Sequence, residues 1–266
     1  MKIILSRKGF DSSTGGMPSP IMPDGTLLSL PIPDEDDKGN TFASLRWNGH
    51  SFADIILSLN SRAAIKPTDG CHLDPDLRRD VKPRMENWMP AFGQMGSALS
   101  ELRNNSVGVG DLFLFFGLFR QTEMTGGTLR FKRGTKVVHV IYGYMQVGKV
   151  IERKETVPAW LSEHPHVAYD MAWNCHRNAI FLPEEQLTLV AGKAGSGTLD
   201  YRSDRILTKD GMSWGRWSLP EFFKDVKISH HPNPWRHGYF QSAGRGQEFV
   251  MEATPEIEAW ARQLIL

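Results

Sequence analysis

The sequence predicts an α/β (α+β) protein in which peripheral helices surround a central mixed, barrel-type β-sheet. Residues 112–119 form an apolar, aromatic-rich run of strand length bounded by glycine, which is typical of a strand buried on both faces. Residues 136–152 alternate as further strands, and apolar residues recur at helical spacing in three separate segments. The chain has 266 residues, 40% of them apolar and 23% charged, which fits one globular domain over residues 1–266.

The N-terminal part is predicted to open with a short buried strand at residues 2–6. Residues 7–16 follow as a loop rich in glycine, serine and charge. The Asp24-Gly25 turn signal precedes another predicted strand at residues 26–30. An acidic patch then follows at residues 34–37, for which we expect a solvated loop.

Three helices are predicted from periodicity and capping residues. The first covers residues 51–59 with Ser51 as N-cap, and the second covers residues 92–103. The third has Thr254 as N-cap and Pro255 at its first position. Their expected buried faces are Phe52, Ile55, Ile56 and Leu59; Phe92, Met95, Leu99 and Leu102; and Ile257, Trp260, Ala261 and Leu264.

The remaining strands are expected to complete the sheet around residues 112–119. Further apolar or alternating runs predict strands at residues 136–144, 145–152, 179–182, 187–190 and 247–251. Prolines and glycines break the segments between them, so residues 61–91 and 192–217 are expected to be mainly loops.

Composition limits the kinds of partner and compartment. The net charge is +1, so we expect any contact with nucleic acid to be local, as with a nucleotide or one flipped base. The two cysteines suggest no disulfide framework, and no apolar stretch is long enough for a signal peptide or a membrane span. We therefore expect a cytoplasmic protein with no membrane partner.

The centre of the chain resembles one known group of barrels. Residues 107–115 read Val-Gly-Val-Gly-Asp-Leu-Phe-Leu-Phe, and residues 138–147 read Val-His-Val-Ile-Tyr-Gly-Tyr-Met-Gln-Val. This combination resembles the PUA-like barrels, which include the ASCH and EVE domains. The resemblance implies a PUA-like barrel core at about residues 107–190. It also implies a reader of RNA or of modified DNA bases.

A second resemblance extends over almost the whole chain. Its carriers are residues 6–11, 72–77, 92–96, 110–120 and 245–250. They are similar to the nucleotide modification associated domain 3 family, although an aromatic residue would be expected at Leu118. The resemblance implies a nucleotide or nucleic acid with a modified base as partner, together with partner modification enzymes. It implies no mechanism and leaves the cofactor unknown.

The opening loop is the first candidate site. Ser6, Arg7, Lys8 and Asp11 bring a hydroxyl, two cations and a carboxylate to the end of a predicted strand, where ligand sites are common. Ser6 and Asp11 are predicted catalytic residues, and Arg7 and Lys8 are predicted to bind substrate phosphate or carboxylate. The alternative is a solvated, salt-bridged loop.

The second candidate is the segment that holds His72, Asp74 and Asp76. These side chains could act as acid and base or bind a metal, and Asp-Pro-Asp is also ordinary turn chemistry. We predict catalytic roles for His72 and Asp74 and substrate binding for Asp76. We predict no metal site, because neither this spacing nor the histidines at residues 164–166 and 230–231 match a standard signature.

The other candidates follow from the resemblance and from their positions at strand ends. They are the predicted substrate-binding residues Gln94, Arg120, Arg245, Gln247 and Glu248. Arg245 could bind phosphate or form a structural ion pair. The C-terminal third also mixes aromatic residues with cations, which could stack on bases or fill the core: Trp214, Arg216, Trp217, Trp235, Arg236, His237, Tyr239 and Arg245.

The functional hypothesis is a protein that recognises or acts on a modified base or nucleotide. As an enzyme it would be a transferase or hydrolase, and it would gather the candidate side chains of both segments into one site. The alternatives are a non-catalytic PUA-like reader of modified DNA or RNA bases and a small-molecule binding protein. A reader predicts an aromatic-lined pocket beside residues 112–119 without clustered titratable groups.

Overall fold

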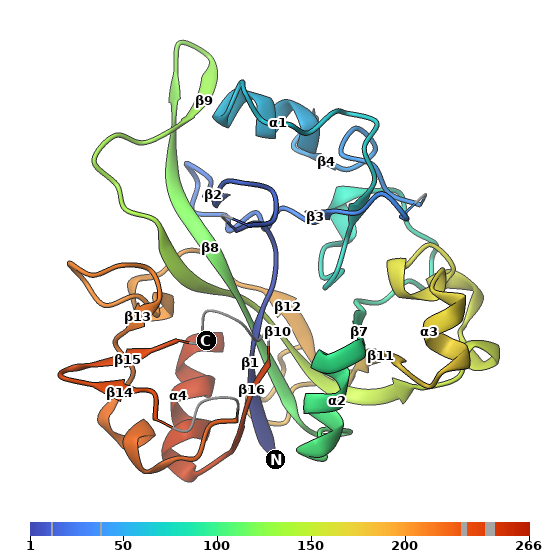
Figure 1. Cartoon of the computed structure of the whole chain (residues 1–266), viewed down its shortest axis with the longest axis vertical. Helices are drawn as coiled ribbons and strands as arrows, with labels where there is room; N and C mark the ends of the chain where they lie inside the picture. The colour runs from blue at the N-terminus through green and yellow to red at the C-terminus, as the bar shows by residue number, and fades with distance from the viewer. Residues whose placement is uncertain (12, 38, 230–232, 243–247) are drawn as a thin grey trace.

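The fold is a mixed α+β architecture built on one curled, half-barrel sheet (Figure 1). It is a computed structural model that describes residues 1–11, 13–37, 39–229, 233–242 and 248–266. The sheet contains β1 (Lys2–Arg7), β2 (Ser19–Ile21), β7 (Phe92–Met95), β8 (Leu112–Thr125), β9 (Thr128–Phe131), β10 (Val138–Ile151), β11 (Asn178–Pro183), β12 (Ser196–Thr198) and β16 (Glu248–Glu252). Its strand order is β16-β1-β8-β10-β11-β7, with β2 and β9 on β8 and β12 on β10.

The predicted central strand is confirmed as the first part of β8. It pairs parallel with β1 and antiparallel with β10. Leu114 and Phe116 point into one core cluster, and Phe113 and Phe115 point into a second cluster on the opposite face. Apolar packing on both faces explains why this stretch carries almost no polar residues.

The helices of the described residues lie around the sheet, and the last of them ends the chain beside β16 (Figure 1). They are α1 (Phe52–Leu59), α2 (Gly96–Asn104), α3 (Asp170–Asn174) and α4 (Pro255–Ile265). The predicted caps are confirmed: Ser51 forms a capping box with Asp54, and Thr254 accepts a hydrogen bond from the Ile257 amide. No helix in the described ranges combines the length and the apolar character that crossing a membrane requires.

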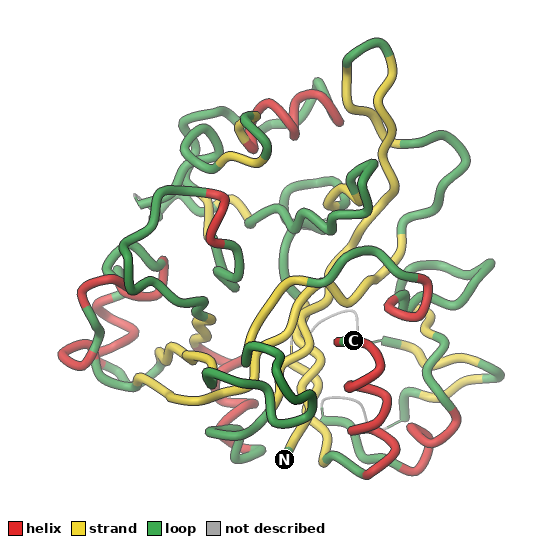
Figure 2. The backbone as a smooth tube through the Cα atoms, turned by 180° about the vertical axis from the view of Figure 1, so that it is seen from behind, coloured by secondary structure: helices red, strands yellow, loops and turns green. Residues whose placement is uncertain are grey.

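Short strands and 3₁₀ turns lie within the long loops that surround the sheet (Figure 2). The short strands are β3 (Ile32–Pro33), β4 (Arg46–Trp47), β5 (His50–Ser51), β6 (Cys71–His72), β13 (Arg216–Trp217), β14 (Trp235–Arg236) and β15 (Tyr239–Gln241). The 3₁₀ turns are η1 (Arg79–Val81), η2 (Lys154–Thr156), η3 (Ala159–Leu161), η4 (Pro165–Val167), η5 (Ser203–Arg205) and η6 (Glu221–Asp225). The pairing of β3 with β6 brings the acidic patch beside the His72 segment.

Three local predictions are wrong. Residues 92–95, predicted as the start of a helix, form strand β7, because they pair with β11 and the helix begins only at Gly96. Residues 26–30 make isolated bridges instead of a strand. Leu187 and Val190 are buried in the core, yet they do not lie in a strand. In each case nonlocal packing outweighs the local pattern. Kinship with the PUA-like barrels stays a prediction.

Candidate functional site

A polar pocket of about 310 Å³ opens where β1 ends. This volume lies at the lower end of the range of small-molecule sites, about 300–1,000 Å³. Its walls come from the opening loop, β3, β6, β7 and the segment around η4, which are far apart in the sequence. Its polar lining includes Arg7, Lys8, Asp11, Asp34, His72, Asp74, Gln94, His166 and Tyr169. The two predicted candidate segments therefore meet in one pocket.

A buried ion pair fixes Lys8 at this pocket. Lys8 Nζ lies 3.1 Å from Glu248 Oε1, and the Glu248 side chain is fully buried. The same oxygen accepts hydrogen bonds from Gln94 Nε2 at 2.6 Å and from Ser6 Oγ at 3.1 Å. The β1–β16 register places Ser6 opposite Glu248. Lys8 Nζ also lies 4.6 Å from the centre of the Phe92 ring. Ser6 is completely buried behind the pocket, where it supports Glu248.

The opening loop owes its shape to Asp11. Asp11 Oδ1 accepts hydrogen bonds from the Ser13 amide at 2.8 Å, from Ser13 Oγ at 2.7 Å and from the Thr14 amide at 2.7 Å. This is the capping of a turn by an aspartate. Burial lowers the pKa of Arg7, and the charge of Asp11 opposes that shift. The guanidinium of Arg7 is half-buried at the pocket wall.

The opposite wall of the pocket holds a cluster of His72, Asp74 and His166. One candidate ligand atom from each residue lies within 4.8 Å of the others. Gly93 on β7 makes this cluster possible: its amide donates to Asp74 Oδ1 at 2.6 Å, and a Cβ there would lie 2.2 Å from the His166 ring. Asn178, on β11 beside β7, contacts His166 Nδ1 at 2.7 Å. The β7–β11 pair thus fixes two of the three side chains.

The electrostatics of the cluster favour a neutral imidazole beside a carboxylate. Burial lowers the pKa of His166 to about 3. Burial by itself would raise the pKa of Asp74, but the neighbouring His164, His166 and His72 outweigh it and lower this pKa to about 2. Hydrogen bonds from His72 and Tyr169 hold the pKa of Asp34 below its usual range. At neutral pH the two carboxyl groups are therefore ionised.

A second cavity of about 230 Å³ shares the opening loop with the polar pocket. Both cavities are lined by Arg7, Lys8, Gly9 and Asp11. The second is otherwise more aromatic, because Trp214 and His139 form part of its wall. Trp217 Nε1 donates to His139 Nδ1 at 2.9 Å, which leaves the proton of the neutral imidazole on Nε2. The loop thus has a titratable pocket on one side and an aromatic cavity on the other.

Several predicted site residues lie elsewhere. Asp76 accepts two hydrogen bonds of 2.6 Å from Arg84 and lines a separate cavity. Arg120 lies farther along β8, where its guanidinium packs over the Phe131 ring at 5.3 Å. Arg245 and Gln247 lie outside the described residues.

Three pocket residues were not among the sequence candidates: Asp34, His166 and Tyr169. Asp34 belongs to the acidic patch that was expected to be solvated, and the Tyr169 hydroxyl donates a hydrogen bond to it. His166 belongs to the His-Pro-His segment, whose local spacing matched no metal signature. The sequence showed only two histidines on either side of a proline. The residues that cluster with His166, namely His72 and Asp74, come from another part of the chain.

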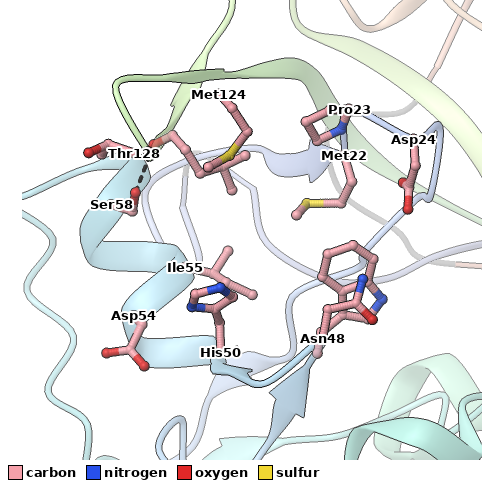
Figure 3. A pocket seen from close by; sticks show the side chains of 13 residues that line it. Met22, Pro23, Asp24, Asn48, His50, Asp54, Ile55, Ser58, Met124 and Thr128 are labelled. Carbon is pink, nitrogen blue, oxygen red and sulfur yellow. Dashed lines mark hydrogen bonds between the residues drawn. The ribbon is translucent and has the colours of Figure 1, made fainter.

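A larger, mainly apolar cavity of about 480 Å³ lies between α1 and the β8–β9 hairpin (Figure 3). Met22 and Met124 face Ile55 and His50 across it (Figure 3). Ser58 Oγ donates to the Leu129 carbonyl at its edge, which ties the helix to the hairpin. Among its described lining residues no metal-binding cluster occurs. The polar pocket is therefore the stronger candidate for chemistry.

Comparison with known families gives this geometry a context. The family profile described as nucleotide modification associated domain 3 matches residues 2–252, nearly the whole chain. The chain belongs to the nucleotide modification associated domain 3 family. The resemblance predicted from sequence is thereby confirmed, and the described residues that line the polar pocket all fall within the matched range. No curated protein and no solved structure matches the chain. For this member of the nucleotide modification associated domain 3 family, the pocket geometry is therefore the main guide to a specific function.

Proposed function

We propose that this protein is an enzyme of nucleotide or base modification and that its substrate binds across the opening loop. One observation carries this proposal: Arg7 and Lys8 share a single pocket with His72, Asp74 and His166. Cations suited to phosphate thus face groups suited to proton transfer. The family's association with nucleotide modification supports a substrate of this class.

Arg7 offers the geometry that suits a phosphate group. A guanidinium presents a planar fork that matches two phosphate oxygens, and it stays charged at neutral pH. Lys8 already has a carboxylate partner in Glu248. Lys8 would therefore act as a fixed positive charge in the pocket wall, partly neutralised by Glu248.

The base would occupy the cavity on the other side of the loop. Trp214 offers an aromatic face there, and stacking on such a face contributes about 1–3 kcal/mol per base. His139 adds a hydrogen-bond donor, because its Nδ1 already accepts from Trp217. The loop of residues 7–11 lines both cavities, so this one loop would contact the phosphate on one side and the base on the other.

Proton transfer would fall to His72. Its Nδ1 contacts the Asp34 carboxylate at 3.3 Å, which orients the ring. The Nε2 atom is then left to take a proton from a water molecule or a hydroxyl group. This set of groups suits hydrolysis or group transfer.

The first test is ligand binding by thermal shift, with nucleosides, nucleoside monophosphates and short oligonucleotides, unmodified and modified. We expect the phosphorylated compounds to raise the melting temperature of the wild type. Arg7→Gln should weaken their binding at least about tenfold, which corresponds to about 1.4 kcal/mol. Arg120→Gln is the matched control and should bind as the wild type does, because Arg120 lies outside the pocket. Absence of any shift would contradict the proposal and favour a small-molecule binding protein.

A non-catalytic reader is the second candidate, and the aromatic cavity beside Leu118 of β8 favours it. Turnover separates the two functions. Incubation of a bound nucleotide or oligonucleotide with the protein, followed by mass spectrometry of the nucleosides, should reveal a changed base or a released group. We expect His72→Gln to abolish this conversion and to retain binding. Tight binding without conversion by the wild type would support the reader.

A further inference from the structure

We propose that His72, Asp74 and His166 bind a divalent first-row transition-metal ion through His72 Nε2, His166 Nε2 and Asp74 Oδ2. This inference deepens the polar pocket described above and changes one role in it: with Nε2 on the ion, His72 would be a metal ligand and no longer the proton acceptor. Metal binding itself does not depend on the substrate being a nucleotide. Two separate segments supply the ligand atoms: His72 and Asp74 come from β6 and the residues directly after it, and His166 comes from η4. In each ligand, hydrogen bonds to the remaining polar atom leave the proposed ligand atom available.

His72 is held in the required tautomer. The Tyr169 hydroxyl donates its proton to Asp34, so both groups beside His72 Nδ1 can only accept there. Nδ1 lies 3.3 Å from Asp34 Oδ2 and 3.1 Å from the Tyr169 oxygen. Nδ1 must therefore carry the proton, and Nε2 keeps a lone pair. A carboxylate behind a histidine is the usual support of a metal ligand.

His166 is fixed by the same logic. Asn178 Nδ2 donates to the His166 carbonyl at 2.7 Å, which turns Asn178 Oδ1 toward His166 Nδ1. That contact of 2.7 Å places the proton on Nδ1 and the lone pair on Nε2.

Asp74 is anchored through one oxygen only. Its Oδ1 accepts the Gly93 amide at 2.6 Å and lies 3.4 Å from His164 Nε2. The His164 ring accepts the His166 amide at Nδ1, so the proton of the neutral ring lies on Nε2, which makes no hydrogen bond of its own to the described residues. Oδ2 lies 4.0 Å from His166 Nε2 and remains for the metal. Contacts from Asp34, Tyr169, Asn178 and Gly93 thus orient the three side chains.

The spacing suits a metal after a small contraction. Ligand atoms about 2.1 Å from a tetrahedral ion lie about 3.4 Å apart. The 4.0 Å between Asp74 Oδ2 and His166 Nε2 exceeds this by a few tenths of an ångström. The ring of His72 is only half-buried, and its rotation would bring Nε2 closer to the other two ligand atoms. Three protein ligands at a pocket wall leave positions for water or substrate, as in catalytic sites.

The donor set determines the class of ion. Two imidazole nitrogens and one carboxylate oxygen suit Zn²⁺, Fe²⁺, Mn²⁺ or Co²⁺. Mg²⁺ and Ca²⁺ prefer oxygen ligands and would bind poorly. A dication with one carboxylate leaves a net positive charge, which would attract an anionic substrate and lower the pKa of a bound water molecule.

The test is calorimetry on chelator-treated full-length protein, with Zn²⁺, Mn²⁺ and Co²⁺ as probes and Mg²⁺ as the hard-cation control. We expect one equivalent of each transition ion to bind and the Co²⁺ complex to show visible absorption bands of low-symmetry coordination. His72→Gln and His166→Ala should weaken binding more than 100-fold, because loss of a supporting group alone costs about 10–100-fold. His50→Ala, an exposed histidine of the apolar cavity, is the matched control and should bind as the wild type does.

The outcomes separate this inference from the proposed function. Because His166 is buried, circular dichroism must show that His166→Ala is folded; His72→Gln carries the test if it is not. Stoichiometric binding that survives both substitutions would overturn the site, and so would the absence of binding by the wild type. Nucleotide-induced melting shifts measured with chelator present test the substrate class alone. Metal binding without those shifts would leave the metal site standing and contradict the nucleotide proposal.

Discussion

Two cavities of this protein differ in how their walls are made. The cavity between α1 and the β8–β9 hairpin is larger, about 480 Å³ against about 310 Å³, and apolar side chains such as Met22 and Met124 form much of its wall. The polar pocket at the end of β1 is lined by ionisable groups, and most of these have a partner on another segment. Volume and apolar character would therefore favour the larger cavity as a ligand site. The ionisable groups that come together from several segments favour the polar pocket.

The difference is informative because buried polar groups are costly. Removing a carboxylate or an imidazole from water is unfavourable unless hydrogen bonds and opposite charges compensate it. Glu248 receives such compensation at Oε1 and Asp74 at Oδ1. Asp74 lines the polar pocket, and Glu248 holds Lys8 at its wall. A protein that needed only a stable core would place apolar residues there. The arrangement is the expected form of a binding or catalytic site.

The largest effect is expected from breaking the ion pair behind the polar pocket. Lys8→Met would leave the fully buried Glu248 carboxylate without its cation. The loss of one partner of a buried pair costs about 3–5 kcal/mol. Urea unfolding should show this as a lower midpoint with an unchanged slope.

The same strand pair provides the control. Lys2 and Glu252 also pair across β1 and β16, at 3.7 Å, but the Glu252 side chain is 77% exposed. Lys2→Met should therefore cost less than about 1 kcal/mol. Equal losses in the two variants would show that the polar pocket is not an electrostatically distinct region.

A smaller effect is expected from filling the space that Gly93 leaves for His166. In Gly93→Ala the new methyl group would lie 2.2 Å from the His166 ring, so the ring or β7 must shift. Overpacking of this kind costs about 1–3 kcal/mol. Urea unfolding measures that loss, and metal titration should show weaker binding. Gly108→Ala, where nothing lies within 4 Å, is the control. Unchanged metal affinity in Gly93→Ala would show that His166 is not a ligand of the metal.

Gly93 also shows why the sequence predicted only part of this site. Residues 112–119 and the N-caps of α1 and α4 were predictable, because apolar periodicity and capping residues are local signals. Residues 92–95 were mistaken for a helix, so the strand that supports Asp74 and His166 was not anticipated. His166 and Asp34 join the pocket only through the β7–β11 and β3–β6 pairings. Such contacts between distant segments have no signature in local spacing.

The next effect concerns pH and the aromatic side of the opening loop. Burial lowers the pKa of His139 to about 3. The charge of Arg7 adds to this shift, and the charge of Asp11 opposes it. An unfolded histidine binds its proton near pH 6.5, so between these values the unfolded state binds more protons. Stability should therefore fall as the pH drops below about 6.5, by about 1 kcal/mol between pH 7 and 5.5.

His139→Gln isolates this contribution. The glutamine does not titrate and can still accept the hydrogen bond from Trp217. Urea unfolding at pH 7 and 5.5 should show a shallower pH dependence for the variant than for the wild type, and the difference between the two slopes is the quantity to compare. Parallel dependences would mean that His139 is accessible to protons in the folded protein.

The smallest effect is expected at the apolar cavity. Met124 is 57% exposed on the β8–β9 hairpin, so Met124→Ala should change the free energy of unfolding by less than about 0.5 kcal/mol. It should also leave nucleotide and metal binding unchanged, because no ionisable group of the polar pocket lines this cavity. Thermal shift and calorimetry measure both. A loss of nucleotide binding in Met124→Ala would move the substrate to the larger cavity, because Met124 lines that cavity and not the polar pocket (Figure 3).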